Sequence, residues 1–184
     1  LYQSVTNGLL VVYNSAAIIN ETGTPTIKTW DHIALVRIGT GLKLYRNGIQ
    51  TGSVTTSVNF NASGLTYISE DPNWTTAYYV NGYIDDYRIT RGVARYTGAF
   101  TPPTVAHPDS LFTYDPNWNN VSILLSMDGL DGSTTFKDET GKIWTTGASA
   151  VISTAKGRFN GCSAFFNGSA YIDTPASLSF KVAN

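Results

Sequence analysis

Short apolar segments alternate with turn-forming residues along nearly the whole chain. Glycine, proline, asparagine and aspartate gather between the segments, where they favour tight turns. Many short segments of this kind predict the strands of an antiparallel sandwich or barrel. Only Thr90–Thr97 has a weak helical pattern. The expected strands lie within Gly8–Asn14, Trp30–Ile38, Leu42–Asn47, Leu65–Ser69, Tyr78–Thr90, Val121–Met127, Ser163–Phe166 and Ala170–Asp173.

The strand expected at Leu42–Asn47 ends at the dipeptide Asn47-Gly48. Asn-Gly is a strong hairpin signal because both residues accept the positive φ angles of a type I′ turn. The sequence therefore predicts a tight turn at this point.

Alternation within Tyr83–Ile89 predicts one face shared by Tyr83, Asp85, Tyr87 and Ile89. Asp85 then lies among large apolar side chains. A buried carboxylate without a partner is costly, so Asp85 needs hydrogen bonds, a cation or a metal ion.

Two parts of the chain resemble one family. The segment Gly82–Tyr96, closed by Phe100–Pro103, resembles the second half of a laminin-G-like domain, and Val121–Lys142 resembles the opening of one. The copies in phage structural and fibre proteins are especially similar to the run Arg88–Thr97. The resemblance implies an all-β fold, an antiparallel jelly-roll β-sandwich of the concanavalin A-like class.

The order of the two halves suggests the domain organisation. Residues 1–104 resemble the C-terminal half of a sandwich, residues 105–120 form a proline-rich connection, and residues 121–184 resemble an N-terminal half. We favour a chain cut across two tandem repeats, and so a piece of a longer polypeptide. The alternative is one permuted domain, in which residues 121–184 close on residues 1–104.

Composition narrows the function classes. Hydrophobic residues make up 42% of the 184 residues, charged residues only 14%, and the formal net charge is −1. Scattered basic residues argue against nucleic acid as a partner, and no apolar run approaches the length of a membrane span. Cys162 is the only cysteine, which excludes an intrachain disulfide, and we interpret it as a small buried residue.

Catalytic motifs are missing from the sequence. The three glutamates, Glu21, Glu70 and Glu139, lie in separate turn regions, so no paired-acid motif of a glucanase is present. No Gly-x-Ser-x-Gly accompanies His32 or His107. The sequence predicts a protein that is not an enzyme.

Acidic and aromatic residues suggest two kinds of binding site. The resemblance implies that acids near the opening motif meet the acid matching Asp85 around one Ca²⁺, which gives Asp85, Asp128 and Asp138 as candidate ligands. Ordinary turn and capping aspartates are the alternative. Aromatic side chains expected in or beside loops stack on sugar rings, and the candidates are Trp74, Tyr78, Tyr79 and Trp118.

These features predict a non-enzymatic structural or adhesive module. The resemblance places it in a phage tail fibre or capsid appendage, on a virion or outside the cell. It would pack against other virion or surface subunits in an oligomer and make weak contacts with a cell-surface glycan. The alternative is an accessory carbohydrate-binding domain of a secreted polysaccharide-degrading enzyme.

Overall fold

The computed structural model describes residues 2–4, 8–13, 16–21, 27–58, 65–70, 79–108 and 115–175. Regular structure in these residues is β-strand, apart from one turn of 3₁₀ helix at Trp118–Asn120. All the described strand pairs are antiparallel. No described helix is long and apolar enough to cross a membrane. The predicted all-β class is confirmed, and residues 90–97 form no helix.

The chain divides into two compact units. The first unit consists of residues 1–59 and 94–102, and the second of residues 60–93 and 103–183. In the second unit, strands within residues 65–90 pair with strands within residues 121–175.

The first unit contains two three-stranded sheets. One has the order β1-β2-β3 and the other β4-β5-β6. At the end of β5, Asn47 and Gly48 have φ angles of 51° and 81°, so the predicted turn is confirmed. The strands are β1 (Tyr2–Ser4), β2 (Gly8–Tyr13), β3 (Ala16–Asn20), β4 (Ile33–Ile38), β5 (Gly41–Arg46) and β6 (Ile49–Thr55).

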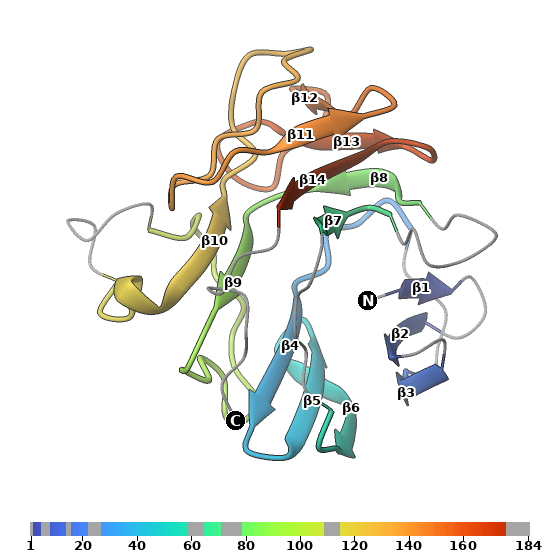
Figure 1. The fold of residues 1–184 in the computed structure, drawn as a ribbon, viewed down its shortest axis with the longest axis vertical. Helices are drawn as coiled ribbons and strands as arrows, with labels where there is room; N and C mark the ends of the chain where they lie inside the picture. The colour runs from blue at the N-terminus through green and yellow to red at the C-terminus, as the bar shows by residue number, and fades with distance from the viewer. Residues whose placement is uncertain are drawn as a thin grey trace. The chain divides into compact units, whose positions relative to one another are not determined.

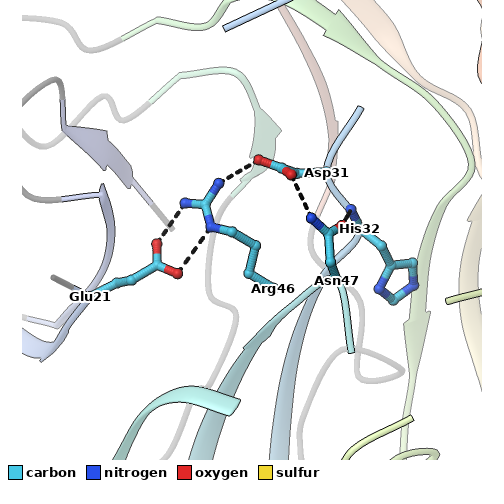
Figure 2. A network of polar contacts seen from close by, with 5 residues as sticks. All are labelled: Glu21, Asp31, His32, Arg46 and Asn47. Atoms are coloured by element: carbon cyan, nitrogen blue, oxygen red, sulfur yellow. Dashed lines mark hydrogen bonds and ion pairs between the residues drawn. The ribbon is translucent and has the colours of Figure 1, made fainter. Parts of the chain in front are cut away.

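A charged network joins the ends of β3 and β5 in the first unit (Figure 2). Arg46 donates from Nε and Nη2 to the two carboxylate oxygens of Glu21, at 3.0 and 2.6 Å, and from Nη1 to Asp31. Asn47 donates to Asp31 at 2.7 Å and accepts from the backbone N–H of His32 at 2.8 Å. The pKa of Arg46 lies above its ordinary value, mainly because of the hydrogen bond to Glu21.

The second unit contains two three-stranded sheets and one strand pair (Figure 1). The sheets have the orders β11-β14-β7 and β12-β13-β8, and the pair is β10-β9. The strands are β7 (Leu65–Ile68), β8 (Asn81–Ile84), β9 (Tyr87–Thr90), β10 (Val121–Leu125), β11 (Thr145–Gly147), β12 (Val151–Ser153), β13 (Ser163–Asn167) and β14 (Tyr171–Pro175).

One apolar core contains residues from both sheets and from the strand pair of the second unit. It contains Ile172 of β14, Phe166 of β13 and Ile123 of β10, each with no exposed surface. Alternate residues of each strand supply this core, so the intervening side chains of β14 and β13 point outward.

The predicted common face of Tyr83, Tyr87 and Ile89 is wrong. Asp86, with φ at 53°, separates β8 from β9, and the two strands pair with different partners. Ile84, Tyr87 and Ile89 pack against the core, whereas the ring of Tyr83 lies 5.1 Å from that of Phe165. A left-handed residue between the strands shifts the alternation by one position.

Replacing Arg46 should destabilise the chain strongly. The side chains of Arg46 and Glu21 are only 18% and 6% exposed, so Arg46→Met leaves a buried carboxylate without its cation. We expect a loss of about 3 kcal/mol of unfolding free energy, measured by chemical denaturation. Lys43→Met, on the same strand, is the control and should change stability by less than about 0.5 kcal/mol. Equal effects of the two substitutions would contradict the role given to the network.

Candidate functional site

The aromatic candidates do not meet at one place in the described structure. Trp74 and Tyr78 lie outside the described residues. Tyr79 donates its hydroxyl to Oε1 of Glu70 at 3.2 Å. Trp118 begins the 3₁₀ helix and donates its backbone N–H to the carbonyl of Asp115 at 3.0 Å. Tyr79 and Trp118 thus have different hydrogen-bond partners, which lie far apart in the sequence.

Tyr79 instead adjoins an aromatic surface on the sheet β11-β14-β7. In the register of this sheet Gly147 lies opposite Tyr171, while Asp173 lies opposite both Thr145 and Tyr67. The alternate residues Ile172 and Ile68 are buried in the core. The outer side of the sheet therefore carries a surface that we call the tyrosine face, made of Tyr67, Thr145, Gly147, Tyr171 and Asp173.

The ring of Tyr171 lies flat across strand β11. A Cβ built on Gly147 would fall 2.7 Å from Cε2 of Tyr171 and closer still to Cζ and Cε1. These ring carbons are nearer than the hydroxyl oxygen, so the glycine lies beneath the face of the ring. The opposite face of the ring points away from the sheet, and Tyr171 is partly exposed. Such a ring offers a flat apolar surface for stacking.

Tyr67 borders this ring. The two ring centroids are 5.8 Å apart at an interplanar angle of 60°, an edge-to-face arrangement. Burial, followed by the charges of Asp173 and Glu70, raises the pKa of Tyr67. Burial and the hydrogen bond to Glu70 raise the pKa of Tyr79. Two carboxylates thus act on the tyrosines at this surface.

Each carboxylate accepts one hydroxyl. Asp173 accepts through Oδ1 from Oγ1 of Thr145 at 2.6 Å, and Glu70 accepts from Tyr79. Both residues are partly exposed, and each carboxylate has further lone pairs that can accept hydrogen bonds. An apolar ring face beside hydrogen-bond acceptors matches the two sides of a sugar, its C–H groups and its hydroxyls.

Sequence reasoning missed most of this surface. The alternation within Leu65–Ser69 and Ala170–Asp173 already separates Tyr67, Tyr171 and Asp173 from the buried positions. A lone glycine in a strand is a signal of close approach by another group, and Gly147 is such a residue. Which strands lie side by side could not be deduced from these patterns.

Asp138, one of the three predicted calcium ligands, has a structural role. Its Oδ1 accepts from the backbone N–H and the hydroxyl of Thr140, at 2.8 and 2.6 Å, and from the N–H of Leu124 at 3.4 Å. Its Oδ2 accepts from Nε1 of the buried Trp144 at 3.0 Å. Asp138 is 6% exposed and joins the loop to β10. These bonds leave it poorly suited to bind a metal ion.

Asp85 and Asp128 do lie near each other. Asp85 accepts from the backbone N–H groups of Arg158 and Phe159, at 2.7 and 2.9 Å, while its Oδ1 is buried without a hydrogen bond. Asp128 accepts from Nδ2 of Asn160 at 2.9 Å and from Sγ of Cys162 at 3.3 Å. Burial raises the pKa of Asp85, and the charge of Asp128 adds to the rise.

Calcium stays a prediction. Within the described ranges, no three histidine, cysteine or acidic side chains gather in a way that would hold a metal ion. Cys162 is buried, as predicted, and burial raises the pKa of its thiol.

Asp128 also lines an open pocket of about 560 Å³. One wall of the pocket is the segment from Val105 to Pro108. Asp86 holds this wall, because its Oδ2 accepts from the backbone N–H of His107 at 3.0 Å and lies 3.6 Å from Nε2 of the same residue. The side chain of Asp86 is 5% exposed, and burial raises its pKa to about 6.

Comparison with known protein families finds one match. A laminin-G family model, described as the concanavalin A-like lectin/glucanases superfamily, matches residues 4–106, more than half of the chain. The chain belongs to this family. The concanavalin A-like family implies the jelly-roll sandwich expected from the sequence, in agreement with the all-β antiparallel structure. Comparison with curated proteins and with solved structures finds no match.

The buried charge of Asp86 should lower stability near neutral pH. Its folded pKa of about 6 exceeds the ordinary value of 3.8, so the folded state holds the proton more tightly between these values. Stability from this group therefore falls as pH rises from about 4 to about 6. Asp86→Asn should be more stable than the original chain by about 2 kcal/mol at pH 7 and no more stable at pH 3.5. Unfolding midpoints measured across this range test it, and parallel curves would contradict it.

The calcium hypothesis predicts a gain in stability from the ion. Calcium added to chelator-treated protein should raise the melting temperature, because a ligand of the folded state stabilises it. The rise should be absent in the Asp85→Asn/Asp128→Asn double variant. Scanning calorimetry measures both, and an unchanged melting temperature in the original chain removes the hypothesis.

Proposed function

We propose that the chain is a non-enzymatic adhesive module that binds carbohydrate through the tyrosine face. The observation that carries this proposal is the ring of the partly exposed Tyr171, which lies flat over Gly147. Tyr67 borders the ring and Asp173 supplies hydrogen-bond acceptors beside it. Membership of a lectin and glucanase superfamily agrees with a sugar as the ligand.

The hydrogen bonds of the buried carboxylates favour a binding role over hydrolysis. Glycosidases use two carboxylates that flank the scissile bond, one of them a proton donor. Asp85 holds two backbone N–H groups, Asp86 holds His107, and Asp138 holds Thr140 and Trp144. These carboxylates therefore stabilise loops and strands. Release of reducing sugar from a bound oligosaccharide would contradict the proposal.

The proposed setting is a phage tail fibre or capsid appendage, in which the module also packs against other subunits. A surface with few charges suits a protein that makes extended contacts outside the cell, and only 14% of the residues are charged. The alternative is an accessory carbohydrate-binding domain of a polysaccharide-degrading enzyme. Fibre repeats on both sides of this segment in its full-length reading frame would favour the first setting, and an adjoining catalytic domain the second.

Two glycine substitutions test the proposed site. In Gly147→Ala the new methyl group displaces the ring of Tyr171, so we expect glycan affinity to fall about tenfold or more. Gly82→Ala is the matched control, because a Cβ at this strand position meets only one side-chain carbon, at 4.0 Å. Binding is measured by screening the 184-residue chain against a glycan panel and titrating the best ligand.

Two tyrosine substitutions supply a second comparison. Tyr171→Ala should remove binding, whereas Tyr83→Ala, on the outer side of the sheet β12-β13-β8, should retain it. The proposal fails if no glycan of the panel binds, or if both tyrosine variants bind as the original chain does.

A further inference from the structure

The tyrosine face and its neighbour Glu70 carry negative charge without a cation. Neither Glu70 nor Asp173 forms an ion pair within the described residues. Each accepts a single hydroxyl instead, from Tyr79 and Thr145 respectively. Asp173 lies opposite Tyr67 in the register of β14 and β7, and Glu70 follows Tyr67 by three residues, so both carboxylates lie near this aromatic group.

This arrangement distinguishes between neutral and charged sugars. The hydroxyls of a neutral glycan stacked on Tyr171 would donate to the two carboxylates but would leave their charges without a counter-charge. A glycan with a protonated amino group would instead form charge-assisted hydrogen bonds to these carboxylates, and such bonds are stronger than neutral ones. The same cation would be attracted to the negative face of a neighbouring tyrosine ring.

We infer that the tyrosine face, together with Glu70, binds amino sugars whose amine is free and protonated. The pyranose ring lies on the outward face of Tyr171, and protonated amines of the glycan pair with Glu70 and Asp173. The inference rests on the proposed function, since it names the class of glycan that the same surface recognises. It requires no covalent step and no metal ion.

A pair of oligosaccharides matched in length tests the inference. A glucosamine oligomer carries free amines, and its N-acetylated counterpart carries none. At pH 5, well below the pKa of about 8 of an α-amino group, which resembles such an amine, the 184-residue chain should bind the glucosamine oligomer about tenfold more tightly in calorimetric titrations. The preference should shrink at 0.5 M NaCl, because salt screens charges that are partly exposed.

Isosteric substitutions assign the preference to the two carboxylates. Glu70→Gln and Asp173→Asn keep the oxygens that accept from Tyr79 and Thr145 and remove only the charges. The double variant should lose the tenfold preference. Asp131→Asn, in an exposed turn of the same unit, is the charge-matched control and should keep the preference.

The outcomes separate this inference from the proposed function. Equal or tighter binding of the N-acetylated oligomer, or a preference that survives in the double variant, would overturn the inference. Binding of neutral glycans alone, lost in Tyr171→Ala, would also overturn it and leave the proposed function standing. Failure of every glycan to bind would overturn both.

Discussion

Burial of alternate side chains in the second unit is the constraint on which the other features depend. Ile172 and Phe166 lie in one core with Ile68 and Ile123, and none of the four is more than 4% exposed. A shift of one residue in the register would exchange the two faces of a strand. By fixing the inner face of β14, the core places Tyr171 and Asp173 outside, where they are available to a ligand.

Several buried carboxylates of this weakly charged chain are stabilised by hydrogen bonds from backbone N–H groups. Asp138 and Asp85 accept N–H groups from loops that would otherwise leave those donors unpaired. In the first unit, the buried carboxylate of Glu21 is stabilised instead by an ion pair with Arg46 that includes two hydrogen bonds. Asp85 and Asp86 each also have one carboxylate oxygen that is buried without a hydrogen bond. Glu70, just after β7, and Asp173, on the outer side of β14, contrast with these residues because both remain partly exposed.

Family membership suggests a class of ligand, whereas the tyrosine face suggests where such a ligand would bind. The lectin and glucanase superfamily includes proteins that bind sugars and proteins that cleave them, so membership alone does not separate the two. The flat ring of Tyr171 and the neighbouring acceptors provide a physical reason for binding. A rigid sheet is a suitable support for such a site, because its side chains are held by the core beneath them.

The sequence by itself determined the strand-rich class, the turn at Asn47-Gly48 and the buried state of Cys162. These features follow from local periodicity, from the φ preferences of single residues and from hydrophobicity. Only the tertiary structure decided that β7 and β11 flank β14 and that Tyr171 covers Gly147. It also showed that Asp138 is occupied by Thr140 and Trp144, and that Asp86 reverses the alternation after β8. Such contacts join residues far apart in the chain, and they depend on which strands pair, a choice that no local pattern encodes.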